Sequence, residues 1–172
     1  ARAFVAAGAE GFSERIPETV VPEVHVGPSN RERLQTFLTA NLRRSAILSR
    51  MRSADVIHLP LTSAVPLLPS SNGQVITVHD LQHLEFPEWF SRPEKLYRKL
   101  AYELPSARAD VIITVSEYAR QSIIQHLHIP ADRVIAIPLG VKLDSFSPID
   151  EPKQNYAMYP ARPWPHKNHK AL

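Results

Sequence analysis

Histidine and aspartate stand side by side at the end of a short apolar segment, in the run from His79 to His83. Three interpretations of this run are open. In the first, His79 is a general base or a ligand of a sugar hydroxyl, and Asp80 orients its ring. In the second, His79, Asp80 and His83 bind a metal ion, with His166 and His169 as further nitrogen ligands at helical spacing. In the third, the histidines satisfy buried backbone groups.

Two cations bracket a proline-stiffened loop near the end of the sequence. Arg162 and Lys167 flank a segment with two prolines, and Asn168 is in position to begin a helix. A helix N-terminus presents exposed backbone N–H groups, and nearby Arg and Lys side chains add positive charge, so this arrangement suits a diphosphate. The same residues also fit an ordinary surface loop with two solvated cations.

Strand and helix patterns alternate around these residues. The run 111–115 (Val-Ile-Ile-Thr-Val) is apolar on both faces, which is typical of a buried parallel strand. Such alternation favours a parallel sheet covered by helices. We therefore predict an α/β fold with a parallel sheet covered by helices. The strands are expected at residues 19–26, 55–59, 74–78, 111–115 and 134–137.

Helix starts are marked by capping residues. Ser29 with Glu32, and Ser91 with Glu94, have the spacing of a capping box. The second helix should run to about residue 104, where Pro105 stops or kinks it because the proline ring excludes the preceding turn.

Polar residues follow the predicted strands. Ligands of open parallel sheets bind at the carboxyl ends of the strands, so we expect these residues to line one cleft if the strands are parallel. For Ser116 and Glu117 a second role is open, because Ser116 is in an N-cap position and Glu117 in the first helical turn. The strand-end residues are His58, His79, Asp80, Ser116, Glu117 and Arg162.

The last part of the sequence predicts a change of domain. Ser147 to Lys153 reads as a linker with two prolines, and Tyr156 to Tyr159 predicts a new strand. We therefore predict a partial first domain over residues 1–150 and the truncated start of a second domain over residues 151–172.

Composition narrows the class of protein. A hydrophobic content of 44% and a charged content of 22% are those of a soluble globular protein, and a net charge of +3 does not imply a nucleic-acid partner. The absence of cysteine excludes disulfides and thiolate metal sites. The sequence also lacks a glycine-rich dinucleotide fingerprint, a phosphate-binding Gly-Lys-Ser/Thr loop and a Gly-x-Ser-x-Gly motif, which weighs against dehydrogenases, nucleoside triphosphatases and serine hydrolases.

Positive charge is concentrated in two segments, Arg43 to Arg52 and Arg92 to Lys99. These segments are either solvated helix faces or a surface that rests on anionic lipid head groups.

Four motifs occur in a fixed order along the sequence. They are Val75-Ile76-Thr77-Val78-His79-Asp80-Leu81, Ala109 to Glu117, Ile137 to Val141 with Phe146-Ser147-Pro148, and Tyr159 to Arg162 with His166-Lys167-Asn168. Together they resemble the retaining family 4 glycosyltransferases of GT-B fold, which have Rossmann-like parallel sheets with helices on both faces. The segments from His79 to Ser91 and from Trp164 to His169 are most similar to the bacterial mannosyltransferase-type members, which build cell-surface polysaccharides.

The resemblance implies a function. Two Rossmann-like domains would face each other across a cleft, the N-terminal one holding the acceptor and the C-terminal one a nucleotide diphosphate sugar. The reaction would transfer a hexose, such as mannose, from a GDP- or UDP-linked donor to a glycan or lipid-linked acceptor, with retention of configuration. No metal or other cofactor is implied. The expected location is the cytoplasm, with peripheral contact at the anionic inner face of the membrane.

The resemblance also implies roles for individual residues. Arg162 and Lys167 match the cations that neutralise the donor diphosphate. His79, followed by Asp80, matches the cleft histidine near the transferred sugar, which makes the two residues candidate catalytic groups. Ser116 and Glu117 match a pair at the cleft wall.

The sequence departs from the family pattern in the segment that leads to the hinge. Leu139 stands where the family commonly has Asn, and Lys142 where it commonly has Asp. A glycine-rich loop is expected before Ala1 and a paired-glutamate motif beyond Leu172, so the isolated chain is expected to lack activity. The alternatives are a nucleotide-sugar epimerase of the same fold, a non-catalytic sugar- or nucleotide-binding module and, least favoured, a metal-binding protein.

Overall fold

The computed structural model of the chain describes residues 1–11, 15–25, 29–69, 73–141, 143–145, 147, 155–162 and 167–171. The chain divides into two units, Ala1–Pro138 and Leu139–Leu172, and each is described by itself. The domain boundary predicted at residue 150 lies in the segment 148–154, outside the described residues.

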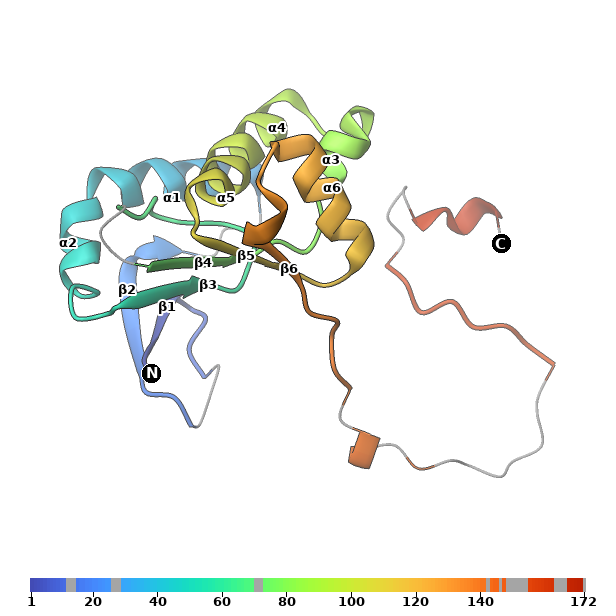
Figure 1. Ribbon diagram of the computed structural model, residues 1–172, viewed down its shortest axis with the longest axis horizontal. Coiled ribbons are helices and arrows are strands. Elements are labelled where there is room, and N and C mark those ends of the chain that lie inside the picture. Colours follow the sequence, from blue (N-terminus) through green and yellow to red (C-terminus); the bar gives the residue numbers. More distant parts are fainter. Residues whose placement is uncertain are drawn as a thin grey trace. The chain divides into compact units, whose positions relative to one another are not determined.

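Four parallel strands form the central sheet of the first unit (Figure 1). They are β3 (Val56–Leu59), β4 (Gly73–Thr77), β5 (Val111–Thr114) and β6 (Val134–Ala136), and each pairs with the next in chain order. A separate parallel pair joins β1 (Ala3–Ala7) to β2 (Glu18–His25). The predicted parallel sheet is therefore confirmed, and the predicted strands lie within one or two residues of the observed ones.

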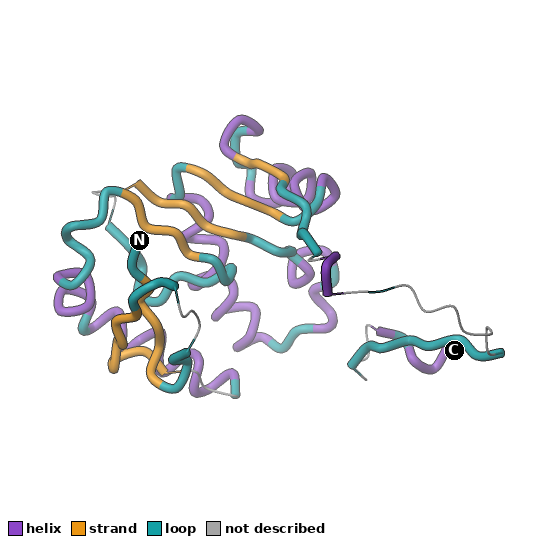
Figure 2. The backbone as a smooth tube through the Cα atoms, turned by 90° about the horizontal axis from the view of Figure 1, so that it is seen from below, coloured by secondary structure: helices purple, strands orange, loops and turns teal. Residues whose placement is uncertain are grey.

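Helices flank these strands, as the α/β prediction requires (Figure 2). Helix α1 packs on β2 and α4, α5 packs on β4, and α6 packs on β5 and β6. The helices are α1 (Asn30–Leu42), α2 (Arg44–Ser49), α3 (Gln82–Glu85), α4 (Arg92–Arg98), α5 (Leu104–Arg108) and α6 (Glu117–Leu127). Short 3₁₀ turns cover Pro87–Trp89, Ala131–Arg133, Leu143–Ser145 and His169–Ala171. No helix among the described residues is both long and apolar enough to cross a membrane.

The predicted caps are present. The Ser29 hydroxyl accepts from the N–H of Glu32 at 3.3 Å, and the Glu32 carboxylate accepts from the N–H of Ser29 at 2.9 Å, which completes a capping box at the start of α1. Ser91 likewise accepts from the N–H of Glu94 at the start of α4. Local sequence thus determines where these helices begin.

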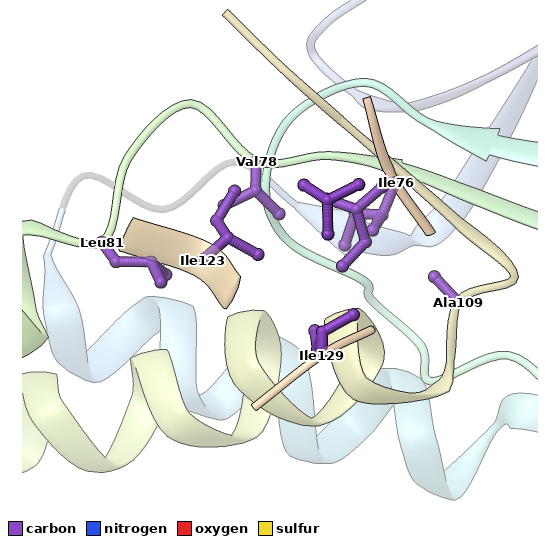
Figure 3. Close-up of a cluster of buried hydrophobic side chains, with 8 residues drawn as sticks. Ile76, Val78, Leu81, Ala109, Ile123 and Ile129 are labelled. Atoms are coloured by element: carbon purple, nitrogen blue, oxygen red, sulfur yellow. The ribbon is translucent and has the colours of Figure 1, made fainter. Parts of the chain in front are cut away.

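The core of the first unit lies between the four-stranded sheet and α6 (Figure 3). Ile76 of β4, Ile112 of β5 and Ile123 of α6 are completely buried there. Apolar side chains that alternate along the strands meet the apolar side of the helix, and burying this surface supplies the main stabilisation. The hydrophobic core therefore joins the central strands of the sheet to α6.

The helical segment that begins with α4 continues past residue 104, so of the two predicted effects of Pro105, a stop and a kink, the stop is wrong. The segment widens into a π-helical turn, Lys99–Glu103, and continues as α5 with Pro105 in its first turn. Pro105 has no N–H to donate to the carbonyl of Ala101, and that carbonyl accepts from the N–H of Ala64 at 3.0 Å instead. A hydrogen bond from a distant loop thus compensates for the proline.

The strand predicted at Tyr156 to Tyr159 is also wrong, because these residues have no regular secondary structure. A strand needs a hydrogen-bonded neighbour, and the described part of the second unit contains no strand to pair with. The helix expected at Asn168 is a single 3₁₀ turn, His169–Ala171.

Two isoleucines on neighbouring strands test this description of the core. Ile112 is 0% exposed and Ile135 is 46% exposed. We expect Ile112→Ala to lower the free energy of unfolding by about 2–5 kcal/mol, because it leaves a cavity in the core. Ile135→Ala is the matched control and should cost less than about 1 kcal/mol. Chemical denaturation of both variants measures the difference, and equal losses would contradict the assigned core.

Candidate functional site

The predicted strand-end residues of the first unit lie at one edge of the sheet. Because β3, β4 and β5 are parallel, their carboxyl ends share this edge, where His58, His79 and Ser116 are found. A hydrogen bond ties two of these ends together, since Nε2 of His58 lies 2.9 Å from Oγ1 of Thr77, the last residue of β4. We call this edge of the sheet, where the carboxyl ends of the parallel strands lie, the carboxyl edge. Arg162, which was expected beside it, belongs to the second unit.

A tight turn after β3 holds the carboxyl edge from one side. Its central residue, Thr62, has a φ of 41°, and the N–H of Ser63 donates to the carbonyl of Leu61 across it. The left-handed region costs an L-residue about 1–2 kcal/mol. The N–H of Thr62 donates to the carbonyl of Thr77 at 2.8 Å, and its hydroxyl accepts from the N–H of His79 at 3.3 Å. The backbone of His79 is thereby attached to the turn.

Asp80 is exposed beside His79 and contacts Gln82. Its two carboxylate oxygens accept from the backbone N–H and the side-chain amide of Gln82, each at 3.3 Å. Asp80 therefore fixes the chain where α3 begins. In the first of the three interpretations Asp80 orients the His79 ring. In this structure the Asp80 carboxylate contacts Gln82 instead.

His83 lies in the interior, only 2% exposed. Its Nε2 is 3.3 Å from the carboxylate of Glu103, and the rings of Phe90 and Tyr102 meet it edge-on. Burial and the positive charge of Arg98 lower the pKa of His83, against the opposing effect of Glu103. His83 is thus a buried histidine with one partnered ring nitrogen, Nε2, whereas its Nδ1 is buried without a hydrogen-bond partner. The partner of Nε2 is a carboxylate and not a backbone group, so the third interpretation does not describe this residue.

The metal-binding interpretation gains no support from the part of the chain that is described. Within those residues, no three His, Cys, Asp or Glu side chains lie close enough to hold a metal ion together. His166, which that interpretation also needed, lies outside the described residues.

Ser116 and Glu117 stabilise the start of α6. The Ser116 hydroxyl accepts from the N–H of Ala119 at 3.1 Å, which is the N-cap contact. Glu117 accepts from Gln121 and forms an ion pair with Arg120, and these two contacts lower its pKa. Both residues lie at the carboxyl edge, and their contacts within the structure are those of a helix cap.

Glu85 joins the two predicted parts of the site, and sequence reasoning did not identify it. Its carboxylate accepts from the hydroxyls of Tyr118 and Ser122, so it fastens α3 to α6. The segment after His79 and the helix that Ser116 begins are therefore one connected unit. The roles of Glu85 and Thr62 depend on contacts with residues far along the chain, Tyr118 and Ser122 for Glu85 and His79 for Thr62, and no local pattern predicts such contacts.

A shallow hollow of about 230 Å³ lies elsewhere, beside α2. None of the predicted site residues lines it, and Arg52 is the one ionisable residue in its lining. It offers neither an acid–base pair nor a phosphate-binding group of the predicted kind. The carboxyl edge is therefore the better candidate site on chemical grounds.

The second unit contains the two predicted diphosphate-binding cations. Arg162 and Lys167 are both exposed, and the ring of His169 contacts the carbonyl of Arg162 at 3.0 Å and the ring of Tyr159 at 5.1 Å. Residues 163–166, with Trp164, and the hinge residues Lys142 and Phe146 lie outside the described residues. The diphosphate role stays a prediction.

The parallel sheet flanked by helices, with polar residues at its carboxyl edge, places the chain among the Rossmann-like α/β proteins. The sequence model of Glycosyltransferase Family 4 matches residues 3–145, and the chain belongs to this family. The predicted family resemblance is thus confirmed. The match starts much earlier than the motif-bearing region, and it ends before Arg162 and Lys167.

A bacterial relative is similar to part of the chain. Over 101 residues the chain is 29% identical to the O-antigen chain mannosyltransferase RfbU of Salmonella typhimurium (strain LT2). The alignment covers 59% of this chain and 28% of the relative, so the chain spans well under half of that protein's length.

The buried histidine predicts a pH dependence of stability. The pKa of His83 is lowered in the folded protein, so below pH ~6.5 the unfolded chain binds a proton that the folded chain does not. Stability should therefore fall as the pH decreases from 7.5 to 5.5. In His83→Gln this fall in stability should be smaller, because the variant lacks the imidazole but keeps all other titrating groups of the unsubstituted protein. Denaturation at several pH values measures both, and identical slopes would refute the prediction.

Proposed function

We propose that this chain is part of a retaining glycosyltransferase that moves a hexose, mannose in the favoured case, from a nucleotide diphosphate sugar to a glycan or lipid-linked acceptor. The observation that carries the proposal is the Family 4 match over residues 3–145. Mannose is favoured because the relative is named as a mannosyltransferase. That name also favours transfer over the two alternatives, an epimerase and a non-catalytic binding module.

The proposed architecture is GT-B, with an acceptor-side domain over residues 1–150 and the start of a donor-binding domain over residues 151–172. The division of the chain into Ala1–Pro138 and Leu139–Leu172 supports a boundary in this part of the sequence. The parallel sheet, with its polar carboxyl edge, supports the assignment of the first unit as one wall of a cleft.

Protein cations supply the electrostatic part of the proposed mechanism. When the sugar leaves, negative charge develops on the departing diphosphate, and Arg162 with Lys167 would stabilise it without a metal ion. His79 would lie near the transferred sugar, as a hydrogen-bonding or proton-accepting group. Asp80, Ser116 and Glu117 would shape the cleft wall, because their contacts fix the starts of α3 and α6.

The donor assignment can be tested by calorimetry on the complete protein that carries this sequence. We expect GDP or UDP to bind, and Arg162→Ala or Lys167→Ala to weaken binding at least tenfold (~1.4 kcal/mol) through loss of a charged phosphate contact. Lys170→Ala is the matched control, because Lys170 is exposed in the same unit. Binding that neither variant changes would overturn the diphosphate assignment.

Peripheral membrane contact is part of the proposal, and α4 is the favoured surface. Phe86 and Trp89 stack at 4.3 Å yet stay 38% and 46% exposed. Lys95 donates to the carbonyl of Pro87, which links this aromatic pair to α4. Exposed aromatic rings beside cations suit the interface of an anionic membrane. The exposed side chains of α4 are Arg92, Pro93 and Leu96, and Lys99 follows it.

The other basic segment is the less favoured membrane surface. In the segment from Arg43 to Arg52, Arg50 forms a bidentate ion pair with Glu23, at 2.8 and 2.9 Å. Part of the positive charge of this segment is therefore neutralised within the protein. The solvated-face interpretation is adequate for this segment.

Vesicle sedimentation distinguishes the two basic segments. The complete protein should bind vesicles rich in phosphatidylserine better than vesicles of phosphatidylcholine. Replacing Arg92 and Lys99 with Glu should weaken this binding, since each cation near the surface contributes about 1 kcal/mol. Arg43→Glu with Arg52→Glu is the matched control from the other segment. A larger loss in the control, or no lipid preference, would contradict the assignment to α4.

A further inference from the structure

We propose that Thr62 is a positioning residue for the transfer reaction, because its hydroxyl fixes the backbone of His79 at the carboxyl edge. This inference rests on the proposed function, in which His79 lies near the transferred sugar. Thr62 would act through His79 and would not itself touch the substrate.

The backbone of Thr62 is in a conformation that its own side chain disfavours. Its φ of 41° lies in the left-handed region, where a β-branched residue is a genuine outlier. Glycine or asparagine would occupy this position at lower cost. Costly backbone conformations persist only where surrounding contacts enforce them, and they are concentrated at functional sites. Threonine at this position is therefore explained by a property of its side chain that glycine lacks.

The Thr62 hydroxyl supplies such a reason. Beyond the end of β4, the N–H of Val78 donates to the carbonyl of Ile113 on β5, at 2.8 Å. The next N–H, that of His79, donates to the Thr62 hydroxyl on the β3 side. A side-chain oxygen thus gives His79 an acceptor just past the last residue of β4. Glycine would relieve the strain but would leave this amide without its partner.

The turn around Thr62 is itself held from both ends. The N–H of Thr62 donates to the carbonyl of Thr77, at the end of β4. On the other side, the N–H of Ala64 donates to the carbonyl of Ala101, the acceptor that Pro105 leaves without a helical donor. Further along, the N–H of Leu67 donates to the side chain of Asn41 in α1. The helices therefore keep the turn against the carboxyl edge.

Valine and serine separate the two properties of the Thr62 side chain. Thr62→Val keeps the β-branched shape but removes the acceptor, whereas Thr62→Ser keeps the hydroxyl. Thr39→Val is a matched control, because within the described residues the Thr39 hydroxyl contacts carbonyls of its own helix, those of Gln35 and Thr36. All three variants would be made in the complete protein and compared with the unsubstituted protein.

Hydrogen exchange of the His79 amide gives the first readout and does not depend on activity. We expect faster exchange of this amide in Thr62→Val and near-normal exchange in Thr62→Ser and Thr39→Val. Unchanged exchange in Thr62→Val would overturn the proposal, whatever the kinetics.

Steady-state kinetics with a nucleotide-sugar donor give the second readout. Misplacement of a reacting group by a small distance can cost about 100-fold in rate, so we expect kcat of Thr62→Val to fall about tenfold or more while the donor KM stays near normal. Serine should restore kcat. A fall in kcat that is matched by Thr39→Val, or that serine does not rescue, would overturn the positioning role. If the unsubstituted protein transfers no sugar, the proposed function fails, and the exchange readout still decides whether Thr62 holds His79.

Discussion

Parallel pairing of β3, β4, β5 and β6 determines where the polar residues of the first unit lie. Parallel strands need crossover connections, and here helices and loops between the strands provide them. The same geometry carries every strand end to one edge, so residues far apart in sequence come close together. Strand direction brings His58, His79 and Ser116 to the same edge, and hydrogen bonds to Thr77 and Thr62 then hold His58 and the backbone of His79 there.

The contacts at the carboxyl edge divide its residues by role. Asp80 holds the start of α3, Ser116 caps α6, and Glu117 pairs with Arg120 within that helix. Glu85 then fastens the two helices to each other. The proposed chemistry of this edge therefore centres on His79, and the neighbouring residues keep its surroundings rigid. Rigid support of a reacting group is what a preorganised site requires.

Sequence predicted the features that depend on local patterns and missed those that depend on distant contacts. Strands β2 to β6 and the Ser29, Ser91 and Ser116 caps follow from short-range periodicity and hydrogen bonding, which are readable in a few residues. Strand β1 (Ala3–Ala7) was not predicted. The continued helix through Pro105 depends on a hydrogen bond from Ala64, which no local pattern announces. The strand predicted at 156–159 is not formed, because the described part of the second unit contains no strand to pair with it. The shared position of His58, His79 and Ser116 at one edge of the sheet was predictable from strand direction, but the turn at Thr62 was not, because threonine disfavours that conformation.

The most direct test of this account is to titrate the complete protein with a nucleotide-sugar donor and to follow backbone amide resonances along the four-stranded sheet. We predict chemical-shift changes at the carboxyl edge, for His58, His79 and Ser116, and little change at the opposite ends of the same strands, for Val56, Gly73 and Val111. Changes concentrated at the opposite ends, or around the hollow beside α2, would contradict the central claim that the carboxyl edge faces the transferred sugar.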